Sequence, residues 1–254
     1  MTLRGRALIT GATAGIGAEF ARQLAARGHD LVLVARNLER LEQLASVLRA
    51  AHGVDVEVLP ADLSRRADVE TVERRLQDAA SPIGVLVNNA GYGLQRQFEE
   101  NAVGEEQELL DVLVTAPMRL CHAALGAMLP RAAGTLINVS SVAAYTPRGT
   151  YGASKAWVLS FSRWANLTYR RRGVTVTAVA PGLVHTEFHD RMRVTTGAIP
   201  EVLWLDPPYV VRKALRAADR GRAVTIPSLR YKLLVALAHV VPPRVAAQGS
   251  LPAR

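Results

Sequence analysis

A tyrosine and a lysine spaced to share one face of a helix are the first candidates for chemistry in this chain. Tyr151 and Lys155 bound the segment Tyr151-Gly152-Ala153-Ser154-Lys155, and residues at i and i+4 are neighbours on a helix surface. An unperturbed tyrosine, with a pKa of about 10, transfers protons poorly at neutral pH. A nearby cation stabilises the phenolate and lowers that pKa. The pair therefore predicts a proton-transfer group, unless it is a structural pair of the same spacing; the surrounding motifs decide between the two.

A glycine-rich turn near the N-terminus is the second chemical signal. Residues Thr10-Gly11-Ala12-Thr13-Ala14-Gly15-Ile16-Gly17 lie between an expected strand at 6–10 and an expected helix at 16–27. Glycines let the backbone approach a pyrophosphate, and a helix N-terminus offers unpaired N–H groups and a positive dipole end. An ordinary strand-to-helix turn is the alternative. The position directly after the first strand favours dinucleotide binding.

The residue after the second expected strand, at 31–35, bears on the choice of dinucleotide. A carboxylate there would accept hydrogen bonds from the adenosine ribose and would repel a 2′-phosphate. This chain has Arg36 instead, and a guanidinium pairs well with phosphate. Arg36 therefore favours NADP(H) over NAD(H), although it is one arginine among many.

The amino-acid composition bears on which other classes of protein this chain could belong to. The 254 residues carry 31 Lys+Arg against 22 Asp+Glu, a net charge of +9, and 49% are hydrophobic, an ordinary globular balance. The arginines are scattered except at 170–172, so nucleic-acid binding is the weaker alternative to a solvated surface. Cys121 is the only cysteine, which excludes an internal disulfide, and His185 and His189 lack a third ligand, so we expect no metal. The sequence shows neither a secretory signal nor an apolar run of the ~18 residues that a membrane span needs, and we expect a cytoplasmic protein.

Apolar runs and helical patterns alternate along most of the chain. Strands are expected at 6–10, 31–35, 54–59, 85–87, 135–139, 174–179 and 223–226, and helices at 16–27, 38–51, 68–80, 105–129 and 154–172. Strands without polar alternation are typical of a parallel sheet covered by helices on both faces. Repeated strand–helix units predict a single doubly wound α/β domain of Rossmann type over residues 1–254, with about seven strands.

Two segments near the C-terminus fall outside that alternation. Residues 185–208 lack periodicity and are expected to be a lid or substrate loop. Residues 228–245 are expected to contain an amphipathic helix whose apolar residues are Leu233, Leu234, Leu237 and Val241. Packing against protein is the favoured interpretation. Covering the active site, an oligomer interface and an anionic membrane surface remain alternatives.

Five motifs in a fixed order carry a resemblance to a known family. They are the glycine-rich turn, Asn88-Asn89-Ala90-Gly91, Asn138-Val139-Ser140-Ser141, the Tyr151/Lys155 pair, and Pro181-Gly182-Leu183-Val184-His185-Thr186. Together, over about residues 4 to 190, they resemble the short-chain dehydrogenase/reductase family in its compact form. The resemblance implies an oxidoreductase that interconverts a ketone or aldehyde and its alcohol, and that forms a homodimer or homotetramer. Together with Arg36 it predicts NADP(H) as the cofactor, and the mostly apolar residues expected around the pocket predict a hydrophobic substrate.

The resemblance also implies roles for individual residues. Tyr151 would be the acid/base, Ser141 would hydrogen-bond the same substrate oxygen, and Lys155 would bind the nicotinamide ribose and lower the tyrosine pKa. Ser140 would pack or bond to backbone. The implied cofactor contacts are Gly11, Gly15, Ile16, Gly17, Arg36, Asp62, Leu63, Asn89, Ala90, Tyr151, Lys155, Pro181, Gly182, Val184 and Thr186. The implied substrate contacts are Tyr92, Tyr145 and His185.

Two departures from the family pattern weigh on activity. Leu113 occupies the place of an asparagine that is thought to hold a water in a proton relay from the lysine, and a leucine cannot bind that water. Ser141 and Tyr151 are also closer in sequence than is usual, so the loop at 146–149 is shortened at the rim of the site. Because of Leu113, an NADPH-binding regulatory or weakly active protein of the same fold is the alternative function.

Overall fold

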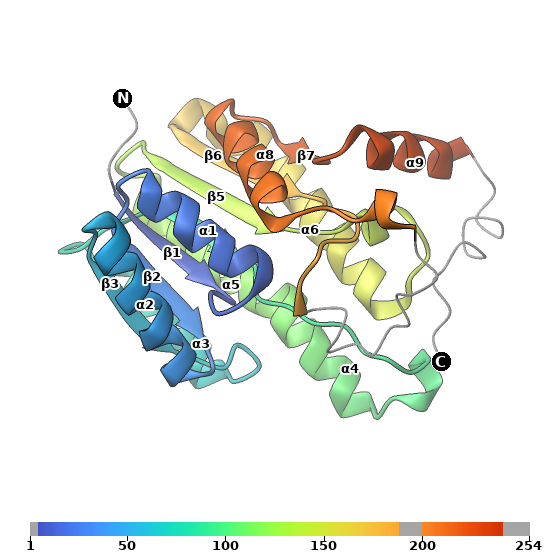
Figure 1. Ribbon diagram of the computed structural model, residues 1–254, viewed down its shortest axis with the longest axis horizontal. Helices are drawn as coiled ribbons and strands as arrows, with labels where there is room; N and C mark the ends of the chain where they lie inside the picture. The colour runs from blue at the N-terminus through green and yellow to red at the C-terminus, as the bar shows by residue number, and fades with distance from the viewer. Residues whose placement is uncertain (1–4, 188–199, 241–254) are drawn as a thin grey trace.

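Seven parallel strands form one sheet in the order β3-β2-β1-β4-β5-β6-β7. The computed structural model describes residues 5–187 and 200–240 (Figure 1). The strands are β1 Arg6–Thr10, β2 Leu31–Ala35, β3 Val56–Pro60, β4 Ile83–Asn88, β5 Gly134–Val139, β6 Val174–Val179 and β7 Val224–Thr225. The predicted fold class, a doubly wound parallel sheet with helices on both faces, is confirmed.

The apolar strands are buried because helices cover both faces of the sheet. Ala7, Leu8 and Ile9 on β1 are fully buried. Successive side chains of a strand point to opposite faces, and accordingly Ile9 packs into one apolar cluster and Leu8 into another. Helices α1 (Gly15–Ala26), α2 (Leu38–His52) and α8 (Pro207–Asp219) contribute to the first cluster. Helices α3 (Arg66–Gln77), α5 (Ala116–Met128) and α6 (Gly149–Tyr169) contribute to the second.

The strand order reverses between β1 and β4, so the connections from these two neighbours diverge to opposite sides. In open α/β sheets the crevice at the carboxyl ends of such strands is the usual ligand site. It is here that the glycine-rich turn after β1, the Asn88-Asn89-Ala90-Gly91 motif at the end of β4, and Ser140-Ser141 after β5 meet.

Several element boundaries differ from the prediction. The helix expected at 105–129 begins at Val103 as α4 (Val103–Leu110), passes through a π-helical turn at Asp111–Thr115, and continues as α5. Helix α6 begins at Gly149 rather than at residue 154, so Tyr151 lies in its first turn. Helix α8 was not predicted; its buried residues Val210, Val211, Ala214 and Leu215 follow helical spacing after the Pro207-Pro208 start.

The continuous helical stretch Val103–Met128 has the length and apolar composition of a membrane span, a match that the sequence interpretation did not foresee. About half of its most apolar window is buried. Leu120, Ala124 and Met128 are buried in the cluster that α3 and the sheet also form. That packing is typical of a core helix.

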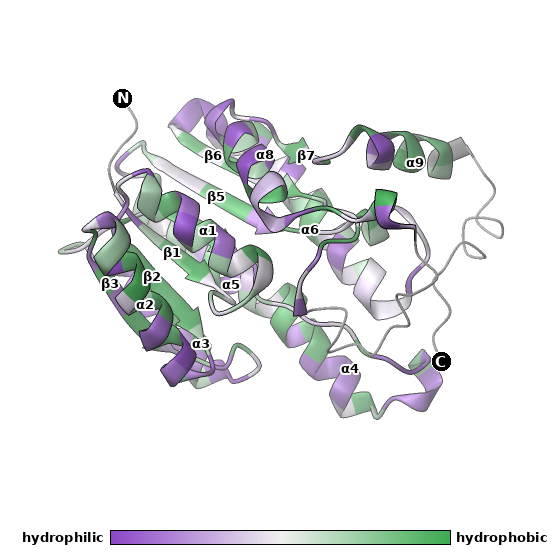
Figure 2. Ribbon diagram, viewed as in Figure 1, coloured by the Kyte–Doolittle hydropathy of each residue, from purple (hydrophilic) through white to green (hydrophobic). Residues whose placement is uncertain are grey.

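The C-terminal helix α9 (Leu229–Val240) projects beyond the sheet, as Figure 1 shows. Its buried side chains are Tyr231 and Val235, whereas Leu233 and Leu237 are 71% and 59% exposed. Figure 2 shows apolar colouring along much of this helix. Within this chain the i, i+4 pair Tyr231/Val235 faces inward, so the expected packing of the leucine face against protein stays a prediction. Val241 and residues 188–199 of the expected substrate loop lie outside the described residues.

Candidate active site

A cavity of about 1280 Å³ lies at the carboxyl ends of the strands. Its walls bring together most of the residues predicted as cofactor contacts, although these come from six separate segments of the chain. These residues are Gly11, Gly15, Ile16, Arg36, Asp62, Leu63, Asn89, Ala90, Tyr151, Lys155, Pro181, Gly182, Val184 and Thr186, and Ser141 lines the same cavity.

The glycine-rich turn forms a cradle that side chains would fill. Gly11 and Gly15 have φ of 65° and 50°, the left-handed region that favours glycine. A Cβ at Gly11 would come 2.9 Å from Cα of Ala90, and one at Gly15 would come 2.7 Å from Cγ2 of Thr186. The first turn of α1 has no side-chain cap, so its N–H groups suit an anion. The cradle fits the pyrophosphate of a dinucleotide.

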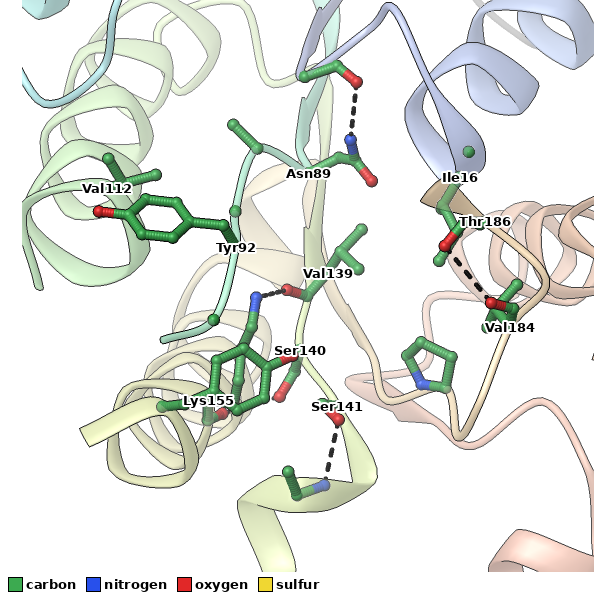
Figure 3. Close-up of a pocket in the computed structure, with 18 of the residues that line it drawn as sticks. Ile16, Asn89, Tyr92, Val112, Val139, Ser140, Ser141, Lys155, Val184 and Thr186 are labelled. Carbon is green, nitrogen blue, oxygen red and sulfur yellow. Dashed lines mark hydrogen bonds between the residues drawn. The ribbon is translucent and has the colours of Figure 1, made fainter. Parts of the chain in front are cut away.

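Gly17 does not line the cavity. A Cβ there would lie 2.2 Å from the carbonyl oxygen of Gly11 and 2.4 Å from Nδ2 of Asn89. Its absence of a side chain lets α1 pack closely against the end of β1. Asn89 then donates to the carbonyl oxygens of Thr10 (3.0 Å) and Gly11 (3.2 Å), as Figure 3 shows for one of these bonds. Asn89 therefore holds the turn that forms the cradle.

Ser141, Tyr151 and Lys155 converge on one side of the cavity. Ser141 ends the extended segment after β5, where its Oγ accepts from N–H of Ala143 at 3.1 Å (Figure 3). The Ser141 side chain also hydrogen-bonds Tyr151. Nζ of Lys155 lies 5.7 Å from the centroid of the Tyr151 ring. It donates to the carbonyl oxygen of Val139 at 2.9 Å. Ser140 donates to the backbone oxygen of Lys155 at 2.7 Å, which confirms its expected backbone role.

Burial shifts the pKa values of Tyr151 and Lys155. Burial raises the pKa of Tyr151 to about 12, although the hydrogen bond with Ser141 acts to lower it. Burial also lowers the pKa of Lys155 to about 8. The expected lowering of the tyrosine pKa is therefore wrong for the protein by itself, because desolvation of the phenolate dominates and Lys155 directs its ammonium to Val139. At neutral pH the site presents a protonated phenol beside an ammonium.

Leu113 lies in the π-helical turn next to this pair. Its side chain is 1% exposed. A Cβ at Gly91 would come 2.8 Å from Cδ2 of Leu113 and 3.7 Å from Nζ of Lys155, so the leucine and the ammonium flank the same glycine. An apolar group thus lies beside the lysine, where the resemblance implies an asparagine amide.

The three predicted substrate residues separate in the structure. Tyr145 lines the cavity near Ser141. Tyr92 also lines it, but its ring points toward Val112 and away from Ser141 (Figure 3). Burial, followed by the charge of Glu108 and a hydrogen bond with it, raises the Tyr92 pKa to about 12.

His185 is absent from the cavity wall, contrary to the prediction. Its Nε2 lies 2.9 Å from Glu201 and its ring stacks on Trp204. Val184 bridges to Leu205 in a parallel pairing, and alternation along this extended segment turns Val184 and Thr186 inward and His185 outward. Among the described residues no three His, Cys, Asp or Glu side chains gather as metal ligands.

The family model described as short chain dehydrogenase matches residues 6–196. The chain belongs to the short-chain dehydrogenase/reductase family. It is 30% identical over 247 residues to rat 17-beta-hydroxysteroid dehydrogenase type 3, covering 94% of this chain and 77% of the rat protein. Of the solved structures, a short-chain dehydrogenase from Sphingobium yanoikuyae in complex with NADPH is 39% identical, with a TM-score of 0.85, over 93% of this chain and 94% of that one. The bulky-bulky ketone specific alcohol dehydrogenase from Comamonas testosteroni is 36% identical, with a TM-score of 0.80, over 98% and 99%.

This member of the family also has site residues on α9. Tyr231 on α9 accepts from N–H of Leu183 (3.0 Å) and donates to the carbonyl oxygen of Leu203 (2.8 Å). The cavity is further lined by Leu234, Val235 and Leu237 of α9. The helix and its apolar residues Leu234 and Leu237 were predicted, with covering of the active site as an alternative. Tyr231 was missed because its contacts with Leu183 and Leu203 join segments far apart in sequence.

Proposed function

We propose that this protein is an NADP(H)-dependent oxidoreductase that interconverts a hydrophobic ketone or aldehyde and its alcohol. One observation carries the proposal: Ser141, Tyr151 and Lys155 converge in the same cavity as a glycine cradle suited to a dinucleotide pyrophosphate. The bound nicotinamide would supply or accept the hydride. The protein's own residues bind the substrate, orient its carbonyl group and protonate the carbonyl oxygen.

Tyr151 acts as the proton donor to the carbonyl oxygen. Its raised pKa keeps the phenol protonated at neutral pH, which suits the reductive direction. Ser141, already bonded to Tyr151, orients the same oxygen with its hydroxyl. Lys155 holds a positive charge near the phenol and offers its remaining N–H donors to the ribose hydroxyls. The site thus fixes the carbonyl against the hydride donor.

NADP(H) is the proposed cofactor because Arg36 lines the cavity at the end of β2. Asp62 also lines it; burial opposes ionisation of Asp62, but hydrogen bonds from Ser64 and the charges of Arg36 and Arg65 leave its pKa lowered. The charge of Arg36 acts on Asp62, so the two side chains lie near each other. This supports Arg36 as the partner of a 2′-phosphate at the adenosine end of the cofactor. The similarity to an NADPH-bound short-chain dehydrogenase supports this choice.

The substrate is proposed to be bulky and apolar. Around Ser141, the cavity walls include Val142, Tyr145, Leu183, Leu234 and Leu237, which favour burial of hydrocarbon surface. The similarity to a bulky-bulky ketone specific alcohol dehydrogenase and to a hydroxysteroid dehydrogenase supports this substrate class. Tyr145 is retained as a substrate contact; Tyr92 is placed on the cofactor side.

Leu113 favours a second candidate, an NADPH-binding regulatory protein with little turnover, because it removes the amide beside Lys155. We further propose a cytoplasmic homodimer or homotetramer, by analogy with the family. Peripheral membrane contact through α9 is a weaker alternative, and nucleic-acid binding is not proposed.

The experiment follows NADPH oxidation with a panel of bulky apolar ketones for wild type and Tyr151→Phe. We expect turnover by wild type and, in the variant, a loss of turnover of at least about a hundredfold that exceeds any change in NADPH affinity, because Tyr151 is also an implied cofactor contact. Tyr209→Phe is the control, since Tyr209 donates to Pro227 outside the cavity. Tight NADPH binding without turnover by wild type on any ketone would favour the regulatory function.

A further inference from the structure

An ion pair between Arg40 and Glu187 closes one side of the cavity. Nη2 of Arg40 lies 2.7 Å from Oε1 of Glu187, and Nη1 lies 3.3 Å from Oε2. Both side chains line the cavity. The geometry is that of a forked, two-bond arginine–carboxylate pair, the arrangement that arginine also uses for phosphate.

Arg40 originates beside the proposed 2′-phosphate site. Its N–H donates to Oδ1 of Asn37 at 2.9 Å, which places it in the first turn of α2. That turn follows directly on Arg36. The backbone of Arg40 therefore starts close to Arg36 in sequence, and its side chain lines the same cavity and extends to Glu187.

Glu187 comes from the opposite side of the glycine cradle. It follows Thr186, whose Cγ2 lies 2.7 Å from the position of a Cβ at Gly15. The segment after the Pro181-Gly182 motif thus passes against the cradle. The ion pair joins this segment to the start of α2, across the groove in which the cofactor phosphates would lie.

The Arg40–Glu187 pair is exposed enough to solvent for Arg40 to exchange Glu187 for another anion. The Arg40 and Glu187 side chains are 39% and 46% exposed, and ion pairs of such exposure contribute only about 0–1 kcal/mol. A phosphate monoester carries more negative charge and more acceptor oxygens than a carboxylate, so it is the stronger partner for the same fork.

We propose that Arg40 is a second determinant of 2′-phosphate recognition and that Glu187 is the counter-ion that Arg40 exchanges for that phosphate. The inference rests on the proposed use of NADP(H). Glu187 holds the guanidinium at the rim of the groove before cofactor binding and competes with the 2′-phosphate for it. NADH, which lacks the phosphate, leaves the pair intact.

The test is equilibrium binding of NADPH and NADH, and of 2′,5′-ADP and 5′-AMP, to wild type, Glu187→Gln, Arg40→Gln and the double variant. We expect Glu187→Gln to tighten NADPH and 2′,5′-ADP roughly threefold to fivefold, because the competitor is gone. NADH and 5′-AMP should not change. Arg40→Gln should weaken NADPH about tenfold or more. In the Arg40→Gln variant, adding Glu187→Gln should not increase the affinity for NADPH.

The double variant separates exchange from general electrostatics. If Glu187→Gln still tightens NADPH when Arg40 is absent, Glu187 acts only by repelling phosphate, and the exchange is refuted. Asp219→Asn is the matched control: Asp219 accepts two bonds of 3.2 Å from Arg27, and these side chains are 46% and 36% exposed, outside the cavity. Asp219→Asn should leave the affinities for NADPH and for NADH unchanged.

A wild type that binds neither NADPH nor NADH overturns the proposed function and this inference together. A wild type that prefers NADPH, with equal responses of NADPH and NADH to Glu187→Gln, overturns the inference alone.

Discussion

The ring of Tyr231 lies directly against Gly182: a Cβ at residue 182 would come 1.9 Å from Cζ of the tyrosine. Helix α9 is thereby seated on the segment that follows β6, and the Tyr231 hydroxyl joins that segment to the turn at 201–203 through Leu183 and Leu203. A residue near the C-terminus thus positions one wall of the proposed nicotinamide site.

Gly182→Ala should displace Tyr231 and lower the free energy of unfolding by about 2–4 kcal/mol, since overpacking a filled site forces backbone shifts. Tyr231→Phe keeps the ring but leaves two backbone groups without a partner, and should cost about 1–3 kcal/mol. Urea unfolding measures both. Tyr209→Phe, which loses one bond, should cost less. Wild-type stability of Gly182→Ala would show that α9 is not seated as described.

Lys155→Met should raise the free energy of unfolding at pH 7 by roughly 1–3 kcal/mol. Burial lowers the Lys155 pKa to about 8 from 10.5, so the unfolded chain holds more protons between these values. The free energy of unfolding of wild type therefore rises relative to that of the variant as the pH rises from about 8 toward 10.5. The difference between the two proteins becomes smaller over this range. Unfolding curves from pH 7 to 10 test this, with Lys232→Met, at an exposed lysine, controlling for substitution itself. A pH-independent gap contradicts burial as the cause.

Leu113→Asn should lower stability while raising turnover. The buried leucine is replaced by an amide with few partners, which costs about 2–4 kcal/mol. The amide would, however, allow a water beside Lys155 and restore a proton path. We expect a severalfold higher kcat and a smaller solvent isotope effect in NADPH-dependent reduction. Leu113→Met preserves the apolar volume and serves as the control. An unchanged kcat would show that the protein relays protons by another route.

Arg36→Ala should weaken NADPH binding by about tenfold to a hundredfold, the worth of one charge-assisted bond, while the affinity for NADH changes less than about twofold. Fluorescence titration at constant ionic strength measures both. Arg66→Ala, on the exposed start of α3, is the control. Equal losses for the two nucleotides would place Arg36 away from the 2′-phosphate.

Leu234→Asn should raise KM for bulky apolar ketones about tenfold, because the cavity loses apolar contact surface and gains a polar group. Small ketones that do not reach α9 should respond less. Leu167→Asn alters a leucine of α6 that is 80% exposed and outside the cavity, and it should leave KM unchanged. The same rise for small and bulky ketones would argue against α9 as a substrate wall.

Much of the fold follows from local pattern. The uninterrupted apolar run Leu31–Ala35 can be stable only with both faces covered, which predicts a buried parallel strand. Helix α8 escaped prediction because it lies next to the aperiodic stretch at 185–208. The π-helical turn at Asp111–Thr115 likewise has no sequence signal, since it is an adjustment within a helix that already had the expected pattern.

The candidate site likewise has some features that the sequence predicts and others that depend on the folded structure. The types and spacing of Tyr151 and Lys155, and the glycines at 11, 15 and 17, are fixed by the covalent sequence, because backbone reach and helix periodicity are local properties. The direction of the Tyr151 pKa, the outward turn of His185 and the junction of Tyr231 with Gly182 arise from desolvation and contacts between distant segments. Only the folded chain determines these, because burial and long-range packing are properties of the whole assembly of elements.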